Sequence, residues 1–435
     1  MSKNRKRNPI PWEGRDIRWD KLDNTAHLFP VIAGEDMTSV YRISVTLTEE
    51  IDPVILQEAL DILLPKFYGF DMRMRAGFFW YYFEENGKRA PRVYEENRFP
   101  CRFIKANRNH SYLFQVSYYQ RRINLEVFHV LTDGMGGLNF LRELCYQYLR
   151  LKHPELRARL GDSLSSDTTL NREDSFIKHY RRKEKNGYKN KRAYLVKGER
   201  LPSGELGVMH AYFELPELKA LCKTYSVTIN EYLVGCFIWA VYTECMNRCP
   251  GAKPIRVAVP VNLRPYFNSN TSKNFFVVVS VEFAPEREDH SFEEILQAVQ
   301  RNLRSQLNLE HLEKLMSYNV ANQKHLVARL TPLPLKHIVM RHVYTGSALA
   351  NTSTLTNIGS IGIAEEYQPY IDAFHAFLPT SKGQHIRSTV CSYKDRLTLT
   401  FSHDLKEPAL LRGFIRQLSR DGLHIKLESN GVNYE

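Results

Sequence analysis

Hydrophobic and polar residues alternate with a period of two along several stretches of the chain, which is typical of β-strands that bury one face. The stretches that we expect to form strands are residues 41–48, 78–83, 112–118, 122–128, 255–259, 275–283, 352–358, 385–393 and 397–403. In other stretches the hydrophobic residues recur every three to four positions, which indicates helices with one buried face. The stretches that we expect to form helices are residues 53–63, 137–151, 216–225, 229–246, 292–309, 311–327, 333–342 and 408–418. The pattern therefore predicts the α/β class, with mixed sheets of the α+β kind covered by helices.

The helix and strand patterns fade between residues 162 and 207, where Lys, Arg, Ser, Asn and Gly dominate. A chain of 435 residues also exceeds the usual size of a single hydrophobic core, so two domains are expected. We expect an N-terminal subdomain at residues 1–165, a basic linker at residues 166–207 with a local helix around residues 175–185, and a C-terminal subdomain at residues 208–435. Each half is expected to combine one sheet with several helices.

The segment from Phe128 to Gly134 carries the clearest chemical signal in the sequence. His129 follows the expected strand 122–128 and continues its apolar row, so its imidazole is expected to point inward. Partial burial disfavours the charged imidazole, which leaves a neutral His129 able to act as a general base near pH 7. Asp133 is expected to brace the loop through a cation from elsewhere in the chain. The alternative is a core histidine followed by an ordinary Asp-Gly turn.

Two segments in the second half of the chain are candidates to complete this site. Arg264 follows the expected strand 255–259 and is a candidate partner for Asp133, because a guanidinium holds a carboxylate through two parallel hydrogen bonds. The alternative for Arg264 is an exposed arginine before a turn. The segment 351–359 is rich in hydroxyl groups and ends in Asn-x-Gly, so it is a candidate source of donors to a developing oxyanion. It is equally typical of a threonine-rich strand followed by a turn.

Composition and charge narrow the class of protein. Hydrophobic residues make up 43% of the chain and aromatic residues 12%, which is ordinary for a globular protein. A net charge of +12 favours binding to nucleic acids, anionic membranes, phosphorylated cofactors or acidic carrier proteins. Part of the excess of Lys and Arg over Asp and Glu lies at residues 3–7 and 181–192. The sequence has no recognition helix, zinc knuckle or aromatic single-strand-binding motif, so we expect no nucleic-acid partner.

The cysteines and the N-terminal residues bear on the compartment. Seven cysteines, with no histidine partners at metal-ligand spacing, predict reduced thiols in a cytoplasmic protein without a metal site or a disulfide scaffold. The basic N-terminus leads into Pro9 and Trp12 rather than an apolar core, so no signal peptide is expected. No apolar run has the length of a transmembrane helix, so we expect a soluble protein.

Taken together and in this order, these segments resemble the CoA-dependent acyltransferase superfamily, which includes chloramphenicol acetyltransferase, carnitine acyltransferases, plant HxxxD enzymes and the condensation domains of peptide synthetases. The matching segments are His129–Gly134 for the HxxxDG motif, Val259–Arg264 for the strand end whose arginine pairs with the motif aspartate, Asn274 and Phe275 for the element after it, and Thr356–Gly359 for the late strand that lines the channel. The resemblance extends over about residues 20–420 and is closest to the alcohol acetyltransferase-like branch.

The sequence also departs from individual branches of that superfamily. Phe128 stands where condensation domains have a second histidine, which argues against a peptide-synthetase role. The DFGWG segment of plant enzymes is absent from the sequence. The 351–359 segment lacks the Ser-Thr-Ser of carnitine acyltransferases, which weakens the assignment of an oxyanion donor.

The resemblance implies two chloramphenicol acetyltransferase-like subdomains that form a pseudo-dimer with a tunnel at their interface. It implies an O-acyltransferase that moves an acyl group, most simply acetyl, from CoA to a small alcohol or amine, with acyl-CoA as co-substrate, no permanently bound cofactor and no acyl-enzyme. The implied catalytic motif residues are His129, Asp133 and Gly134, with His129 as general base. Asp133 and Arg264 are implied to brace the loop, Asn274 to support the site, and Thr356 or Asn357 to donate to the oxyanion. The alternatives are a carrier-protein-dependent condensation, polyketide-associated or wax-ester acyltransferase, and a non-catalytic binding protein of the same fold. A basic nucleic-acid binder is the third alternative.

Overall fold

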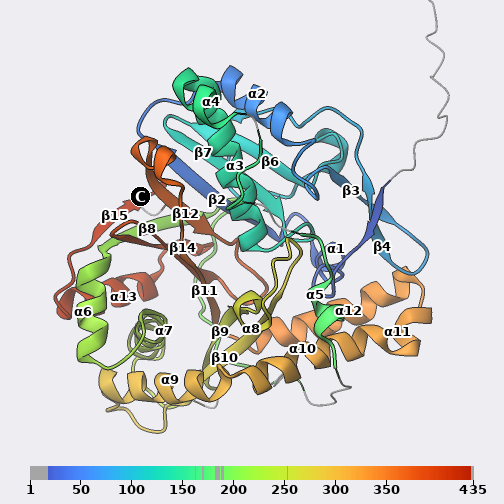
Figure 1. The fold of residues 1–435 in the computed structure, drawn as a ribbon. Helices are drawn as coiled ribbons and strands as arrows, with labels where there is room; N and C mark the ends of the chain where they lie inside the picture. Colours follow the sequence, from blue (N-terminus) through green and yellow to red (C-terminus); the bar gives the residue numbers. More distant parts are fainter. Residues whose placement is uncertain are drawn as a thin grey trace, which may run out of the picture.

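The computed structural model describes residues 18–161, 163–168, 171–181, 187, 191–251 and 253–432. Its strands form two large sheets and one small sheet, and helices pack against both large sheets (Figure 1). The small sheet has the order β1–β4–β3, with β1 at Trp19–Lys21, β4 at Tyr81–Glu85 and β3 at Met72–Ala76. The mixed α/β class expected from the pattern is confirmed.

The first large sheet has five strands in the order β12–β2–β7–β6–β5. Its strands are β12 (Ile371–Phe377), β2 (Val40–Leu47), β7 (Arg122–Phe128), β6 (Phe114–Tyr119) and β5 (Tyr94–Glu95). Neighbouring strands are antiparallel except β5 and β6. Helix α2 (Pro53–Leu63) packs against α3 (Gly134–Lys152), and α3 packs against β2 and β7. Helix α2 begins where the Asp52 carboxylate accepts the backbone N–H groups of Val54 and Ile55, the usual role of an N-cap aspartate.

The second large sheet has seven strands in the order β10–β9–β11–β13–β14–β8–β15. Its strands are β10 (Phe276–Phe283), β9 (Ile255–Asn262), β11 (Ser353–Ser360), β13 (Ile386–Tyr393), β14 (Arg396–His403), β8 (Gly207–Glu214) and β15 (Lys426–Ser429). Strand β11 runs parallel to both β9 and β13, and the other neighbours are antiparallel. The helices α7 (Ile229–Ala240), α9 (Phe292–Gln306) and α13 (Ala409–Arg420) supply much of the core beside this sheet.

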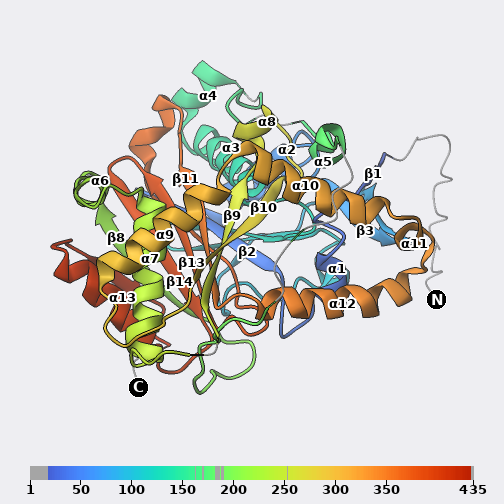
Figure 2. The ribbon, with the colours of Figure 1, turned by 90° about the horizontal axis from the view of Figure 1, so that it is seen from below.

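The remaining helices lie around these layers. They are α1 (Phe29–Ile32), α4 (Pro154–Leu160), α5 (Ser175–His179), α6 (Leu215–Thr224), α8 (Arg264–Phe267), α10 (Leu309–Lys324), α11 (Leu326–Leu330) and α12 (Leu333–Leu349), with short turns η1 (Ala106–Arg108), η2 (Val241–Cys245) and η3 (Glu365–Tyr370). Figure 2 shows α10 and α12 extending from the body of the molecule, with α11 joining their far ends. Residues along most of α10 and in the C-terminal part of α12 line a large cavity.

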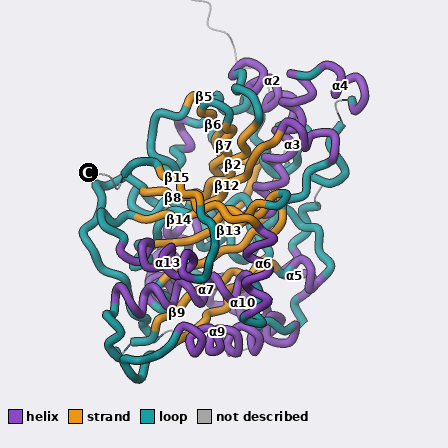
Figure 3. The backbone as a smooth tube through the Cα atoms, turned by 90° about the vertical axis from the view of Figure 1, so that its left-hand side faces the viewer, coloured by secondary structure: helices purple, strands orange, loops and turns teal. Residues whose placement is uncertain are grey.

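A strand from near the C-terminus completes the first sheet. β12 pairs antiparallel with β2, so that Phe374 lies opposite Val45, and it also contacts β13 and β14 of the second sheet. The two large sheets therefore meet along β12. Figure 3 shows the strands of the first sheet above those of the second, with β12 between them. The expectation that each half of the chain builds its own sheet is wrong at this strand. The expected division of the chain at residues 166–207 stays a prediction.

Other departures from the predicted elements are local. Residues 229–246 form α7 followed by the π-helical turn η2, not one continuous α-helix. Of the helix expected around residues 175–185, the described residues show α5, and residues 182–185 lie outside them. Residues 3–7, Pro9 and Trp12, together with much of the basic run 181–192, lie outside the described residues.

The described residues include every cysteine of the chain. All seven cysteines are free, and Cys249 is the exposed one. No helix in the described part of the chain combines the length and apolar character needed to cross a bilayer. The expected cytoplasmic location stays a prediction.

Candidate active site

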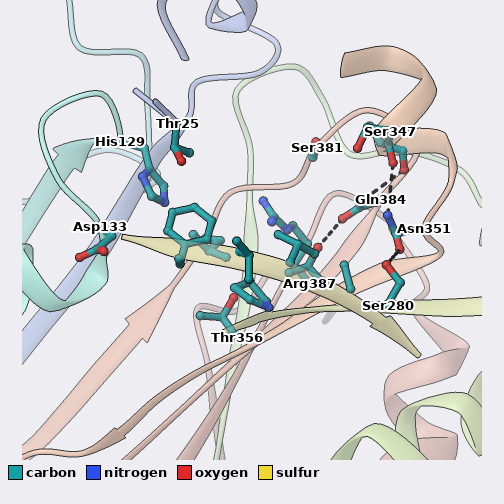
Figure 4. A pocket seen from close by; sticks show the side chains of 18 of the residues that line it. Thr25, His129, Asp133, Ser280, Ser347, Asn351, Thr356, Ser381, Gln384 and Arg387 are labelled. Atoms are coloured by element: carbon teal, nitrogen blue, oxygen red, sulfur yellow. Dashed lines mark hydrogen bonds between the residues drawn. The ribbon is translucent and has the colours of Figure 1, made fainter. Parts of the chain in front are cut away.

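His129 lies in the turn between β7 and α3, one residue after β7 ends. Its backbone N–H donates to the carbonyl oxygen of Ser39, just before β2, at 2.9 Å, so the turn is held against the first sheet. The imidazole is half-buried and lines a large cavity (Figure 4). The inward orientation expected from the apolar row is therefore present, and the ring faces a cavity and not filled core.

The hydrogen-bond network fixes which nitrogen of His129 carries the proton. Nδ1 of His129 lies 3.0 Å from Oδ1 of Asn274. The amide nitrogen of Asn274 donates to Oδ2 of Asp23 at 2.9 Å, so the amide oxygen is the atom that faces the histidine. Nδ1 must then be the donor, which leaves Nε2 with a free lone pair. This is the tautomer that a general base requires.

The surroundings of His129 keep its ring neutral. Phe29 stacks on the imidazole at 4.4 Å between ring centroids, and Tyr41 meets it edge-on at 5.1 Å. Burial lowers the pKa of His129 below its usual value, and the positive charge of Arg387 lowers it further. The negative charge of Asp133 acts in the opposite direction but does not overcome burial. The imidazole is therefore neutral near pH 7.

Asp133 is bound on all sides by N–H donors. Arg264 donates to it through Nη1 at 2.8 Å and Nη2 at 3.0 Å, and both side chains are about 8% exposed. The backbone N–H of Phe275 donates to the same carboxylate at 3.0 Å, and those of Met135 and Gly136 cap the start of α3. The pairing of Asp133 with Arg264 is thus the one expected from the sequence, and none of the hydrogen bonds of Asp133 goes to His129.

Arg264 also fixes the loop that delivers Asn274. Its Nε donates to the carbonyl oxygen of Thr271 at 2.9 Å, and its Nη2 donates to that of Lys273 at 2.8 Å. One guanidinium therefore joins the start of α3 to the loop before β10. Asn274 follows directly in that loop, so the residue that orients His129 is positioned by the same arginine.

The last glycine of the motif, Gly134, and Gly136 after it differ in whether a side chain would fit. A methyl group on Gly134 would meet Ile358 at 3.9 Å, which is ordinary contact. A methyl group on Gly136 would lie 1.9 Å from Oγ1 of Thr132 and 2.7 Å from the carbonyl oxygen of Ser272. The close approach of α3 to the loop before β10 therefore requires glycine at position 136, which the motif does not mark, and leaves room at Gly134.

The cavity has a volume of about 1050 Å³ and is lined by both large sheets, α1, α10 and α12. Thr356 on β11 lines it, and its buried Oγ1 has no hydrogen-bond partner among the described residues. Thr389 lies beside Thr356 in the pairing of β11 with β13, and its Oγ1 is equally without a partner in the described chain. Asn357 is exposed, and its side-chain oxygen accepts the backbone N–H of Gly359. Thr356 is thus better placed than Asn357 to donate to a bound group.

Sequence reasoning missed three residues of this site, namely Asp23, Phe29 and Arg387. Asp23 lies in a polar lead-in without a motif, and Phe29 belongs to a helix of only four residues. Arg387 occupies a polar position in a strand that the pattern did predict, so only its charge could have marked it. No cluster of three potential metal ligands occurs in the described residues.

Comparison with known proteins gives structural matches alone. No family profile matches the chain, and no curated protein matches it in sequence. Polyketide synthase associated protein 5 from Mycobacterium tuberculosis is 15% identical, with a TM-score of 0.59, over 92% of this chain and 96% of that protein. TRI101 from Fusarium sporotrichioides, solved with coenzyme A and T-2, is 12% identical with a TM-score of 0.60 over 94% of this chain and 99% of that protein.

A condensation domain matches as well. The first condensation domain of the CDA synthetase is 11% identical, with a TM-score of 0.59, over 94% of this chain and 99% of that domain. These likenesses extend over nearly the whole chain in each case, so they cover both large sheets. The chain therefore has the two-subdomain chloramphenicol acetyltransferase-like fold that CoA-dependent acyltransferases share with condensation domains.

Proposed function

We propose that the protein is an acyltransferase that moves an acyl group from a CoA thioester to a hydroxyl or amine acceptor. The observation that carries the proposal is the neutral His129, with Nδ1 held by Asn274 and Nε2 free, on the wall of a cavity of about 1050 Å³. A fold of this kind hosts several functions, so the assignment rests on the site and not on the fold. That TRI101 was solved with coenzyme A supports a CoA donor.

In the proposed reaction His129 acts once as a base and once as an acid. Its Nε2 takes the proton of the acceptor hydroxyl while the oxygen attacks the thioester carbonyl carbon. The new C–O bond gives a tetrahedral oxyanion, to which the free hydroxyl of Thr356 donates a hydrogen bond. Collapse breaks the C–S bond, and the imidazolium returns the proton to the departing thiolate. No acyl-enzyme forms, because both substrates react while held at one imidazole.

The other site residues hold this geometry. Asp133 and Arg264 fix the start of α3 to the loop before β10, and Asn274 sets the tautomer of His129. Gly134 opens the helix next to the cavity without crowding Ile358. These residues are structural or positioning, and His129 alone exchanges a proton with the substrates.

The proposal has two competitors that share the site. A donor thioester carried on a phosphopantetheinyl carrier protein is chemically equivalent to CoA, and the protein's net charge of +12 suits an acidic carrier. A cavity of about 1050 Å³ also has room for an acyl group longer than acetyl. A binding protein without catalysis is the alternative from another class.

The test is release of free thiol from acetyl-CoA and longer acyl-CoAs, and from an acyl-carrier protein, against a panel of alcohols and amines. We expect release with CoA donors, and we expect His129→Ala to lower kcat by at least about 100-fold with an unchanged melting temperature. Wild-type turnover in the folded variant would overturn the assignment of the base. Release from the carrier alone would favour the carrier-dependent enzyme, and ligand-induced stabilisation without any release would favour a binding protein.

A further inference from the structure

Four arginines of the described chain line the cavity, and one of them differs from the others. Arg42 pairs with Glu126 at 2.7 Å and also with Glu96, Arg256 pairs with Glu282, and Arg264 pairs with Asp133. Arg387, near the start of β13, has no carboxylate of the described residues within ion-pair distance. Three of the four charges are therefore neutralised by the fold itself, and the fourth is not.

The guanidinium of Arg387 is also short of hydrogen bonds. Nη1 donates to the carbonyl oxygen of Pro379 at 3.2 Å. Nε is buried and has no acceptor within the described part of the protein. An arginine has five N–H donors and stays protonated in proteins, so most of its hydrogen-bonding capacity is unused here. The residue is half-buried, and a charge that is partly withdrawn from water without a partner destabilises a fold, so a ligand that supplies the missing anion is the simplest reason for its presence.

The position of Arg387 limits what this anion is. In Figure 4 Arg387 lies between His129 and Gln384, and all three line the same cavity. Arg387 is close enough to His129 for its charge to lower the pKa of the imidazole. A thioester that reacts at His129 is separated from the phosphates of CoA by the whole pantetheine arm. The anion next to the reaction centre must therefore belong to the acyl group or to the acceptor.

The groups around Arg387 are neutral and polar. Oγ1 of Thr354 donates to the side-chain oxygen of Gln384 at 2.8 Å, and the hydroxyls of Tyr344 and Ser381 lie 2.6 Å apart. These side chains satisfy one another and leave the arginine as the charged group at this part of the wall. Such a setting matches a carboxylate, which accepts two parallel N–H bonds from a guanidinium and further bonds from hydroxyls.

We propose that Arg387 binds a carboxylate of the substrate, so that the enzyme transfers acyl groups to or from molecules that carry an acid next to the reacting centre. The carboxylate has two possible sources: an acceptor that is a hydroxy or amino acid, or an acyl group that is a half-thioester of a dicarboxylic acid. The inference rests on the proposed acyltransferase function and specifies its substrate class.

The experiment separates the two sources by kinetics. One arm compares hydroxy acids with their methyl esters as acceptors of acetyl-CoA, and the other compares succinyl-CoA with butyryl-CoA against a neutral alcohol. In the arm that carries the natural carboxylate we expect Arg387→Met to lower the ratio of kcat/KM for the acid to kcat/KM for its neutral analogue by about 100-fold. Arg387→Lys keeps the positive charge but cannot donate two parallel hydrogen bonds to a carboxylate. Its preference for acids is expected to lie between those of the wild type and Arg387→Met.

Controls distinguish this role from others. Arg396→Met removes an exposed arginine of the neighbouring strand β14 and is expected to change neither substrate class. Equal loss on acids and neutral analogues in the Arg387 variants would overturn the inference, because it would indicate a direct role at the oxyanion. Absence of any preference for acids in the wild-type enzyme would overturn it too.

A binding measurement keeps the site testable if no thiol release is found. Succinate and short hydroxy acids should raise the melting temperature of the wild-type protein and not that of Arg387→Met. Such a result would support the carboxylate site while contradicting acyl transfer. Without ligand, Arg387→Met is expected to melt no lower than the wild type, because it removes an unpaired, half-buried charge.

Discussion

The reactivity of His129 depends on a chain of hydrogen bonds that begins at Asp23. The carboxylate of Asp23 accepts the backbone N–H of Ala26 at 2.8 Å and both the backbone and side-chain N–H groups of Asn274. Burial raises the pKa of Asp23 to about 6, so it is ionised at neutral pH despite its enclosure. An ionised Asp23 holds the amide of Asn274 in the orientation that makes Nδ1 of His129 a donor.

Replacement of Asn274 by alanine should therefore reduce catalysis and leave substrate binding largely intact. Without the amide oxygen, Nδ1 no longer has a fixed acceptor, and the proton is free to move to Nε2, where it blocks the base. We expect kcat to fall about 10-fold with KM little changed. Asn270→Ala, at an exposed asparagine of the same loop, is the matched control and should keep the wild-type kcat. A loss confined to KM would contradict the role in orienting His129.

The sequence supports some of this site and not the rest. His129, Asp133 and Arg264 follow strands that alternation predicts, so their positions at strand ends could be derived. Asp23 and Asn274 meet because the segment before α1 packs against the loop before β10. Local sequence patterns do not predict contacts between segments so far apart in the chain. Arg387 was visible as a polar residue in a predicted strand, but its lack of a partner is a property of the folded cavity alone.

An ion pair joins the start of helix α3 to the segment that follows β9 of the second sheet. Asp133 caps α3, and Arg264 lies at the first position of α8, two residues after β9 ends. The close approach of the two elements is completed by Thr132, whose hydroxyl donates to the carbonyl oxygen of Ser272, and by Gly136. The cap, the ion pair and the glycine together fix the turn that carries His129.

Asp133→Asn should lower stability as well as activity. The asparagine retains one acceptor oxygen but leaves the buried guanidinium of Arg264 without a counter-charge, and breaking a buried pair from one side is strongly destabilising. We expect the free energy of unfolding to fall by about 3 kcal/mol, measured by urea denaturation at neutral pH. Asp36→Asn, at an exposed aspartate, provides the baseline. An unchanged denaturation midpoint would show that the pair does not brace the fold.

Several of the strands that the pattern did not predict are either mostly buried on both faces or very short. β12 is buried at every position except Asp372, so its sequence does not alternate between apolar and polar residues. Neither β8 nor the short strands β1, β5 and β15 showed an alternation that predicts a strand. Longer helices such as α2, α9 and α13 were predicted because each buries an apolar stripe, whereas the short helix α4 was not predicted. The membership of β12 in the first sheet follows from packing between distant parts of the chain, which periodicity does not report.

The junction of the two large sheets contains a pair of buried histidines. His210 on β8 and His375 on β12 have ring centroids 4.5 Å apart. The hydroxyl of Tyr212 lies 2.8 Å from Nε2 of His375, and that of Thr400 lies 2.8 Å from Nδ1 of His210. Burial lowers the pKa of His210 to about 3 and that of His375 well below its usual value, with Arg122 adding to both shifts. The sheets therefore meet around two neutral imidazoles.

These histidines should make the whole molecule lose stability in acid. Between pH 6.5 and 4 the unfolded chain binds protons at His210 and His375 while the folded protein does not, so the free energy of unfolding falls as the pH falls. His27, with a pKa lowered to about 4 by burial and by the charge of Lys336, acts in the same direction, and so does His129. Asp23 opposes them: its pKa is raised to about 6 from 3.8, so between those values the folded protein binds a proton that the unfolded chain lacks.

Because the histidines with lowered pKa values outnumber the two aspartates with raised ones, Asp23 and Asp174, stability should decline below pH 6.5 with a slope of up to about 1.4 kcal/mol per pH unit for each histidine in excess. Urea denaturation at pH 7.5, 6.5 and 5.5 measures this slope. His375→Gln keeps a polar group near Tyr212 but cannot be protonated, so it should reduce the slope by about one histidine's contribution. His424→Gln, at a side chain that is 88% exposed, should leave the slope as it is. If both variants kept the wild-type slope, the acid sensitivity would not come from the histidines at the sheet junction.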